Sequence, residues 1–406
     1  MYKLGKTFVL ALFTFFAFSC GGEKESAEND STNILADFSF SVDTVVVDPG
    51  EELISLPYGL GTYTINESKS HIYLFDRNNY LINKVNLNSL KLEEQFQLEK
   101  EGPNGIGEYV RILEVFSGEK FFTSGYDKSS LIDRNGVMIK DYSPKAEKIN
   151  IEGLEDDLKY SLYYEQIFSP EDEVLYSLPG DFNKGIRKLA KINFREQTGK
   201  IYQLPILEVV ADYQVKLNSK DGLMTYIEET YLQKLNDRYF LSARPTNEIY
   251  EFVPDLDSLF LYKYNFSVAP NRKEKQIRKE VSSQEEFESE MEKARTQIGF
   301  EKLIYDDKSE RYYRFGRIYQ ARVDKEAPLK AQVFLFAFDK NLKLIGETEI
   351  PELDRAPLSA FFKDGKLWSY VNVDDELGFA VFDFVSVPKN NGRRNPSERE
   401  IKINNL

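Results

Sequence analysis

The sequence is poor in the residue types that most catalytic and metal sites need. Its 406 residues include one cysteine, one histidine and one tryptophan. A single cysteine excludes a disulfide framework within the chain, and a single histidine excludes most multi-histidine metal sites. Basic residues are also outnumbered, since 53 Lys and Arg stand against 67 Asp and Glu for a net charge of -14. A general nucleic-acid binder needs a basic face, so we expect no nucleic-acid partner. We also expect no metal and no cofactor.

Aromatic residues, by contrast, are abundant. The chain has 30 Phe and 25 Tyr, and 14% of its residues are aromatic. This composition supplies a large hydrophobic core and excludes a disordered protein.

Residues 1–19 have the pattern of a lipoprotein signal peptide. Two lysines precede an apolar run over residues 8–18, which is too short to span about 30 Å of hydrocarbon. The run ends in Ala-Phe-Ser-Cys, as in a bacterial lipobox, where the cysteine becomes the lipidated first residue of the mature chain. An ordinary cleaved signal is the alternative, but an unpaired cysteine in an exported chain would be a reactive liability. We therefore expect an acyl anchor on Cys20 and no spanning helix.

The rest of the chain divides into three parts. Residues 20–36 are acidic and lack large apolar side chains at their start, so we expect a flexible tether. Residues 37–387 form the folded body. Residues 388–406 carry an excess of Lys and Arg and form a basic C-terminal tail.

The body has the pattern of many short strands. Apolar residues alternate with a period of two, and turn residues interrupt them about every eight to twelve positions. Aromatic strand-like segments begin at six places: His71, Lys120, Val174, Arg238, Tyr312 and Lys366. Six units in this body average about 58 residues, slightly above the usual propeller repeat of ~40–50. We predict an all-β, six-bladed β-propeller, although seven blades would also fit.

A propeller has to close its ring, because an open ring leaves unpaired strand edges. The β-branched run at residues 43–47 precedes the first full unit. We expect it to pair within the last blade, near residues 379–384. Two dipeptides, Asn135-Gly136 and Asp364-Gly365, predict tight type I′ hairpins.

One insertion breaks the β pattern. Ser282 and Ser283 with acidic residues three positions later form overlapping capping boxes, and Gly299 stands where a helix often ends. Apolar residues between them follow helical spacing: Phe287, Met291, Ala294 and Ile298. We predict an amphipathic helix over residues 283–298, lying on one face of the propeller.

Three segments resemble a known group of proteins. Residues 99–109 (EKEGPNGIGEY) look like the glycine-proline turn of lipid-anchored, TolB-like six-bladed propellers from Bacteroidota. Residues 305–314 (YDDKSERYYR) and 242–250 (SARPTNEIY) are similar to recurrent segments of the same group. That group is of unknown function, so the resemblance implies a fold and an outer-membrane location but no activity or catalytic residue.

Little in the sequence supports nucleophilic catalysis. His71 is the only imidazole, and the sequence ties no Ser or Asp to it, so we interpret it as a surface or packing residue. Paired carboxylates can hydrolyse glycosides without histidine, but with 67 acids only geometry can identify a pair. We therefore assign no catalytic residue.

The residues most suited to ligand binding are polar and aromatic groups near predicted strand ends. An arginine in the channel of the ring would favour carboxylate-bearing ligands. The alternative is that the tyrosines pack between blades and the arginines pair with acids. Our candidates are Arg244, Asn247, Tyr312, Tyr313, Arg314 and Trp368.

The sequence thus favours a lipoprotein of the bacterial outer membrane, periplasmic or surface-exposed. It would act as a non-catalytic binding or scaffolding propeller for a protein, peptide or glycan, with the membrane contacted through the N-terminal lipid. The alternative is a carboxylate-dependent glycoside hydrolase or related hydrolase on the same fold.

Overall fold

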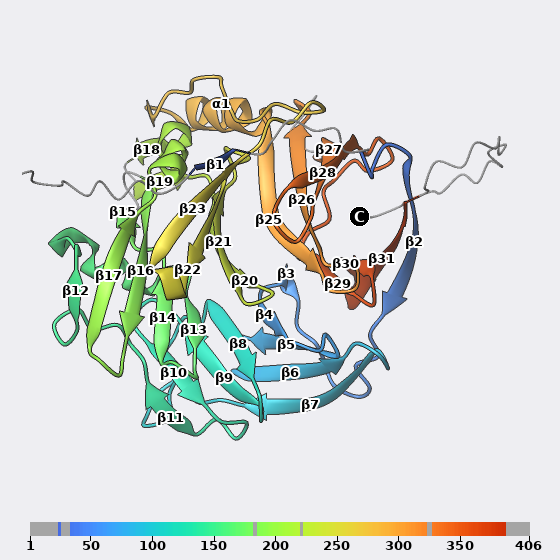
Figure 1. The fold of residues 1–406 in the computed structure, drawn as a ribbon. Helices are drawn as coiled ribbons and strands as arrows, with labels where there is room; N and C mark the ends of the chain where they lie inside the picture. Colours follow the sequence, from blue (N-terminus) through green and yellow to red (C-terminus); the bar gives the residue numbers. More distant parts are fainter. Residues whose placement is uncertain (1–22, 26–32, 182–184, 220–221, 323–326, 387–406) are drawn as a thin grey trace, which may run out of the picture.

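The computed structural model describes residues 23–25, 33–181, 185–219, 222–322 and 327–386. These residues form six β-sheets arranged as the blades of a ring, with a seventh, smaller sheet beside them (Figure 1). The six-bladed β-propeller expected from the sequence is confirmed. Residues 1–22, which include the predicted signal peptide and Cys20, and residues 387–406, which include the predicted basic tail at 388–406, lie outside the described part of the chain.

The first two blades are four-stranded antiparallel meanders, entered through β3 (Pro57–Leu60). Blade 1 consists of β4 (Thr62–Ile65), β5 (His71–Asp76), β6 (Leu81–Asn86) and β7 (Lys91–Gln97). Blade 2 consists of β8 (Ile112–Phe116), β9 (Lys120–Ser124), β10 (Ser129–Ile132) and β11 (Met138–Asp141).

The next two blades carry extra strands at their edges. Blade 3 consists of β13 (Ile167–Ser169), β14 (Val174–Ser177), β16 (Ile186–Asn193), β17 (Thr198–Gln203), the outer β12 (Asn150–Glu152) and the short β15 (Gly180–Asp181), and it follows the 3-10 helix η1 (Asp156–Tyr163). Blade 4 consists of β20 (Thr230–Leu235), β21 (Arg238–Ala243), β22 (Ile249–Val253) and β23 (Ser258–Lys263), with η3 (Pro254–Leu256) at one turn and β1 (Glu23–Glu25) paired to its outer edge.

The last two blades complete the ring. Blade 5 consists of β25 (Gly299–Asp306), β26 (Arg311–Tyr319), β27 (Ala331–Phe338) and β28 (Leu344–Glu349). Blade 6 consists of β29 (Phe361–Lys363), β30 (Lys366–Val373), β31 (Glu376–Ser386) and, from the other end of the chain, β2 (Phe38–Val46).

The ring closes where the sequence predicts it. β2 pairs antiparallel with β31 along its whole length, with Val45 opposite Phe379 and Phe40 opposite Phe384. The hydrogen-bond ladder therefore joins the two ends of the folded body within one blade and leaves no gap in the ring.

The aromatic segments of the sequence are the second strands of the blades. β5, β9, β14, β21 and β30 begin at the residues expected, and β26 begins at Arg311, one residue before Tyr312. Neighbouring blades cover both faces of these strands, so nearly every side chain of β5 and β9 is buried. This explains why these segments are continuously apolar instead of alternating.

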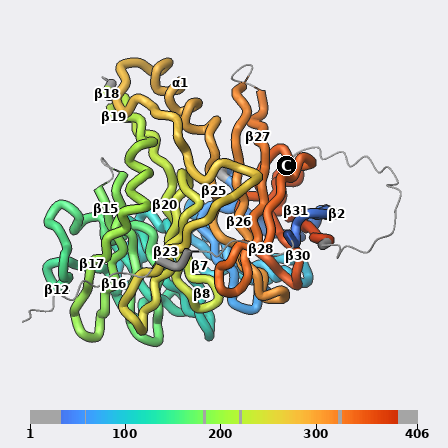
Figure 2. Tube along the Cα trace, turned by 45° about the horizontal axis from the view of Figure 1, so that its top comes forward, coloured from blue at the N-terminus to red at the C-terminus, as the bar shows by residue number. Residues whose placement is uncertain are grey.

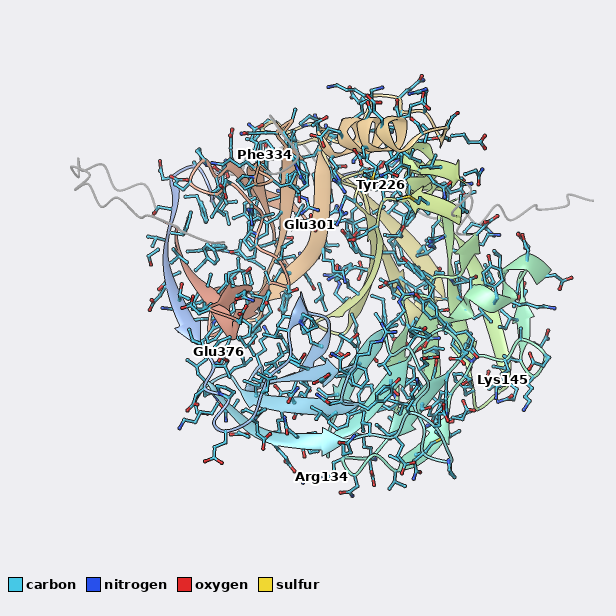
Figure 3. The ribbon with its side chains drawn as sticks, turned by 180° about the vertical axis from the view of Figure 1, so that it is seen from behind. Arg134, Lys145, Tyr226, Glu301, Phe334 and Glu376 are labelled. Atoms are coloured by element: carbon cyan, nitrogen blue, oxygen red, sulfur yellow. The ribbon has the colours of Figure 1, made fainter. Side chains whose placement is uncertain are left out.

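A small unit, here called the cap, is inserted between the blades at one end of the ring. It consists of η2 (Pro205–Tyr213), β18 (Val215–Ser219), β19 (Gly222–Tyr226), β24 (Glu280–Val281) and α1 (Gln284–Arg295). Figure 2 shows β18, β19 and α1 together at this end, and in the view from behind Tyr226 lies next to α1 (Figure 3). The helix packs on the small sheet through Phe287, which is buried with Val215 and Leu217.

The helix is shorter than the sequence predicts. Ser283 is the N-cap, and its side chain accepts a hydrogen bond from the backbone N–H of Glu286 at 3.2 Å. The helix ends at Arg295, and Gly299 opens β25 instead of ending the helix. A Cβ at Gly299 would lie 3.0 Å from Cγ of Arg244, so this glycine allows a close approach between blades 4 and 5.

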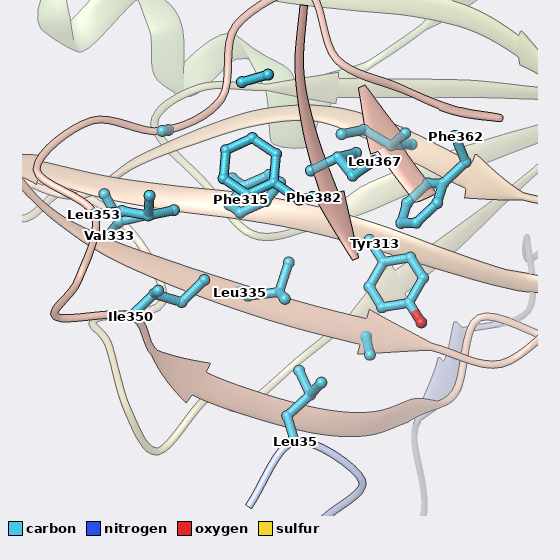
Figure 4. Packing of buried hydrophobic residues seen from close by; sticks show 14 of the residues in the cluster. Leu35, Tyr313, Phe315, Val333, Leu335, Ile350, Leu353, Phe362, Leu367 and Phe382 are labelled. Carbon is cyan, nitrogen blue, oxygen red and sulfur yellow. The ribbon is translucent and has the colours of Figure 1, made fainter. Parts of the chain in front are cut away.

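The core is a series of aromatic layers between the blades. Between blades 5 and 6, Phe315, Val333, Leu335 and Phe382 pack together and Leu35 reaches the same cluster (Figure 4). Asn33 also exchanges hydrogen bonds with the backbone of Glu347, at 2.8 Å and 3.0 Å. Asn33, Leu35 and β1 thus contact the ring although they lie within the tether predicted at residues 20–36, and the boundary at residue 37 remains a prediction.

Candidate functional site

The loops at one end of the ring meet around its axis. The innermost strands are β4, β8, β13, β20, β25 and β29. Neighbouring inner strands contact one another around the axis, as β4 does β8 and β20 does β25. Since every blade repeats the same antiparallel order, all six inner strands run in one direction. The residues that precede or open them therefore gather at one end, here called the mouth, and include Arg111, Glu165, Glu229, Glu301 and Lys302. Glu301 lies toward the centre of the ring in Figure 3.

Tyrosine and arginine side chains alternate along the mouth of blades 1–3. Tyr109 and Tyr126 are 43% and 59% exposed, and their ring centroids are 5.8 Å apart. The guanidinium groups stack on ring faces: Arg77 lies 4.5 Å from the centroid of Tyr109, Arg111 lies 5.1 Å from those of Tyr126 and Tyr164, and Arg187 lies 4.6 Å from that of Tyr164. We call these six residues the tyrosine–arginine row.

Two arginines of the row are poised to bind an anion. Arg77 and Arg111 are exposed, and within the described residues neither side chain forms a hydrogen bond or an ion pair. Stacking on a tyrosine holds the plane of the guanidinium but leaves its N–H donors at the edge directed outward. Lys302 is also exposed, and its Nζ lies 5.5 Å from the centroid of Tyr231. The mouth thus presents cations on a chain whose net charge is -14.

One glutamate lies among these cations. Burial raises the pKa of Glu165, while Lys302 and Arg111 oppose this rise and Glu229 adds to it. Its backbone is left-handed, with φ of 46°, a conformation that non-glycine residues adopt only where their surroundings enforce it. Glu114, on the inner strand β8, accepts a hydrogen bond from the N–H of Phe168 at 3.0 Å, and burial raises its pKa to about 7.

The other half of the mouth is an ionic cluster beneath the cap. Lys273 and Glu228 form a fully buried ion pair, and Lys273 also donates to the carbonyl of Ala294 in the cap at 2.6 Å. Burial lowers the pKa of Lys273, although Glu228 opposes this. Arg244 pairs with Glu229 at 2.7 Å, and these contacts fasten the cap to blade 4.

Three buried polar atoms of this ionic cluster have no hydrogen-bond partner among the described residues: Oε2 of Glu228, Nε of Arg244 and Oε1 of Glu301. Such atoms commonly bind ordered water or a polar ligand group. The ionic cluster continues into blade 5, where Arg317 and Glu301 lie 2.9 Å apart.

The six residues proposed from the sequence fall at different places. Asn247, Tyr312 and Arg314 are at most 2% exposed. Arg314 donates to the backbone carbonyl of Asn247 at 2.9 Å. The side-chain amide of Asn247 donates to the backbone carbonyl of Tyr264 at 3.0 Å. These contacts hold blades 4 and 5 together, and ligand binding by the three residues remains a prediction.

The other three candidates lie apart from that group. Tyr313 is buried between blades 5 and 6, with its ring centroid 5.1 Å from that of Phe362. Trp368 is half-buried in blade 6 against Phe361, at 6.1 Å. Arg244 is the one candidate within the ionic cluster of the mouth.

The tyrosine–arginine row was not recognised from the sequence. Some members lie just before an inner strand, as Tyr109 and Arg111 do before β8. The others lie between the second and third strands of a blade, as Tyr126 does, or at the start of the third strand, as Arg187 does on β16. The available signal is therefore positional, namely an exposed tyrosine or arginine at the end of a strand that opens a blade.

Three further observations concern a groove, metal binding and membrane-spanning helices among the described residues. A polar groove of about 440 Å³ lies beside η2 and is lined by Glu208, Asp212 and Arg272, among others. Within the described ranges no group of three His, Cys, Asp or Glu side chains could hold a metal ion. No helix in that part of the chain is long and apolar enough to cross a membrane.

Comparisons with known proteins identify a family but no activity. The solved structure of a DUF4221 family member from Bacteroides vulgatus aligns with 86% of this chain and 99% of its own, with a TM-score of 0.60 at 14% identity. An exported protein from Bacteroides fragilis (90% and 99% covered, TM-score 0.47, 9% identity) and the Cps50 β-propeller domain from Myceliophteria thermophila (81% and 82%, 0.40, 12%) are more distant. No curated protein matches. The family model for a domain of unknown function, DUF4221, matches residues 33–349, and the chain therefore belongs to the DUF4221 family.

Proposed function

We propose that the protein is an envelope-anchored, non-catalytic β-propeller that binds a protein, peptide or glycan partner at its mouth. The tyrosine–arginine row is the observation that carries this proposal. Tyr109 and Tyr126 offer large, rigid, amphipathic surfaces, a property of residues that dominate binding energy at interfaces.

The charges of the row suggest what the partner carries. Arg77 and Arg111 have no ion pair among the described residues, and a stacked guanidinium is suited to bidentate hydrogen bonds with a carboxylate. At least twenty-two other Lys and Arg side chains of the described residues, by contrast, take part in ion pairs. A carboxylate-bearing partner would complete the charges that the mouth leaves unpaired.

Affinity capture from native envelopes tests the binding site. The proposal expects one partner to be recovered with the wild-type protein and lost with Arg111→Gln and with Tyr126→Ala. Tyr160→Ala is the matched control, because Tyr160 is also 59% exposed but lies outside the row. A partner retained equally by all variants would exclude the row as its binding site, and the absence of any macromolecular partner would exclude the function.

We also propose that Cys20 carries the lipid anchor at the bacterial outer membrane. The support is the short apolar run and the lipobox-like residues that end at this cysteine. Metabolic labelling with a palmitate analogue should mark the wild-type protein and not Cys20→Ala, which should leave the membrane fraction. Labelling of the variant would show that Cys20 is not the acylated residue.

The alternative function is a carboxylate-dependent hydrolase, and Glu165 is the observation that favours it. A strained backbone and a raised pKa, with a second carboxylate at Glu229 nearby, are features of acid catalysts. Turnover of envelope glycans that disappears in Glu165→Gln, with partner binding unchanged in that variant, would favour hydrolysis over binding alone.

A further inference from the structure

The single histidine of the chain lies in a hydrogen-bonded relay at the end of the ring opposite the mouth. His71 opens β5, after the turn that follows the inner strand β4. Its Nδ1 lies 2.8 Å from Oγ of Ser70, and its Nε2 lies 3.0 Å from Oε2 of Glu93 on β7. Serine, histidine and glutamate thus stand in the order nucleophile, base and orienting acid.

The neighbouring hydrogen bonds favour one direction along this relay. Glu93 accepts from Nδ2 of Asn86 at 2.7 Å and, being a carboxylate, also accepts from the ring nitrogen that faces it. The proton of the neutral ring therefore lies on Nε2, and Nδ1 of His71 is the lone-pair acceptor. Asn66 donates from Nδ2 to Oγ of Ser70 at 3.0 Å, and Oγ of Ser68 lies 2.9 Å from the same atom. With Ser68 as the donor of that second bond, the hydroxyl hydrogen of Ser70 points to Nδ1 of His71. This is the polarity that a general base needs.

The surrounding turn holds the serine in place but leaves it accessible. Oδ1 of Asn66 accepts from the backbone N–H groups of both Ser70 and His71, at 3.0 Å and 2.9 Å. The side chains of His71 and Glu93 are 20% and 38% exposed, and Ser70 is half-buried. A small electrophile can therefore reach Oγ from solvent.

We propose that Ser70 is an activated nucleophile, with His71 as its general base and Glu93 as a positioning residue, that takes the acyl group of small activated esters. Oγ of Ser70 attacks the ester carbonyl while its proton moves to Nδ1 of His71. The bond to the leaving alcohol breaks, and that alcohol takes the proton from His71. Water then hydrolyses the acyl-serine by the same route, so ester and water become acid and alcohol.

The same geometry limits the rate. The N–H groups of Ser70 and His71 are already used by Asn66 and cannot stabilise a tetrahedral oxyanion. We therefore expect slow reaction with activated esters and organophosphorus electrophiles, and no hydrolysis of peptides. This activity is independent of the mouth and of the binding function proposed for it.

A fluorophosphonate probe tests the proposal on the full-length protein. Attack by Ser70 forms an oxygen–phosphorus bond, expels fluoride and gives the proton to His71, so peptide mapping by mass spectrometry locates the adduct. We expect labelling at Ser70, its loss in Ser70→Ala, and a fall of about 100-fold or more in labelling rate in His71→Gln. Ser117→Ala is the matched control, since Ser117 is an exposed serine in the corresponding turn of blade 2, between β8 and β9.

Glu93 requires a readout that a structural role would not change. Glu93→Gln should slow labelling and Glu93→Asp should restore part of it, while thermal unfolding stays the same for both. Labelling of Ser70 at the wild-type rate in His71→Gln would overturn the proposal. So would an adduct on Ser68 instead of Ser70, or labelling no faster than that of the unfolded chain.

Discussion

Replacing Arg314 with methionine should destabilise the ring where blades 4 and 5 meet. The guanidinium is fully buried and donates to three backbone carbonyls, those of Glu301 at 2.8 Å, Asn247 at 2.9 Å and Ala243 at 3.2 Å. Burial lowers the pKa of Arg314 to about 10. The three carbonyl groups compensate for the loss of hydration of the guanidinium, because they accept from all sides of its planar fork. No other side chain has donors in this planar arrangement.

The size of the loss follows from which carbonyls lose their donor. Glu301 lies at a β-bulge, where the register of β25 shifts between Phe300 and Leu303, so its carbonyl is outside the regular ladder. The carbonyl of Ala243 also accepts from the backbone N–H of Thr246, so the carbonyls of Glu301 and Asn247 are the two left unsatisfied. Each unsatisfied buried carbonyl costs about 1–3 kcal/mol. Methionine keeps most of the apolar contact with Phe300, and removing a buried charge offsets part of the cost. We expect a net loss of about 3 kcal/mol in the free energy of unfolding.

Urea unfolding followed by Trp368 fluorescence and by circular dichroism measures this loss. Arg314→Lys should fall between wild type and Arg314→Met, because one ammonium replaces only part of the planar fork. Arg311→Met is the control on the same strand, and we expect a change of no more than about 0.5 kcal/mol there. An Arg314→Met variant as stable as the wild type that no longer captured a partner would refute this reasoning and make Arg314 a ligand-binding residue.

Two further predictions concern ring closure and the cap. Phe40→Ala on β2 should lower the free energy of unfolding, measured in urea, by about 1–3 kcal/mol, because the centroid of the Phe40 ring lies 5.5 Å from that of Phe382 across the closing ladder. Ser41→Ala is the control and should have little effect, since Ser41 is exposed to solvent. Equal losses in the two variants would contradict a role of the Phe40 face in closing the ring. Burial alone would raise the pKa of Glu290, but hydrogen bonds from Lys293 and the N–H and guanidinium of Arg278 lower it to about 2. Glu290 therefore stabilises the cap above about pH 4.5, and this stabilisation is lost as the pH falls toward 2. The difference in Tm between wild type and Glu290→Gln should shrink over that pH range. A constant difference would show that the ion pairs of Glu290 with Lys293 and Arg278 contribute nothing.

The fold could be predicted from the sequence because its strongest signals are repeated and mutually dependent. In most blades the second strand is buried on both faces, so the unit shows one nearly continuous aromatic segment, such as that beginning at Lys120 or Arg238. In β30 of blade 6 burial alternates along the strand instead. A ring also requires a closing strand, and few segments outside the six units could supply one. The run at residues 43–47 was therefore identifiable, and residues 43–46 pair with residues 378–381 of the last blade, close to the segment expected at residues 379–384.

Local turn geometry was only partly predictable. Asp364 and Gly365 both have positive φ, 55° and 78°, as the predicted type I′ hairpin requires. In Asn135-Gly136 only the glycine has positive φ, at 76°, so the same prediction was wrong there. The reason is the neighbouring Asp133, whose carboxylate accepts from the N–H groups of Asn135 and Val137 and stabilises a longer loop.

The binding residues could not be ranked from the sequence, because exposure depends on how blades meet. Arg314 follows Tyr313 directly and Arg111 follows Tyr109 by two residues, yet Arg314 is enclosed by two blades and Arg111 stacks at the open mouth. Likewise, His71 and Glu93 are 22 residues apart and lie on strands that are not neighbours in the chain. A local sequence pattern does not contain these distances, which arise only when the meander of blade 1 folds.

The distribution of charge explains how an acidic chain can present a site for an anionic group. Most cations outside the mouth are neutralised by nearby carboxylates, as Arg134 is by Glu94 at 2.6 Å, so they add little to the field of the surface. At physiological ionic strength charges are screened beyond about 8 Å, and the net charge of -14 then contributes less to binding than the groups in contact. Because Arg77 and Arg111 are held by tyrosine rings rather than by carboxylates, their donors remain available at contact distance. Stacking alone does not separate them from the structural cations, because Lys140, Arg238 and Arg317 also lie over tyrosine rings but pair with carboxylates. The difference is that the tyrosine is the main contact of the guanidinium group in Arg77 and Arg111.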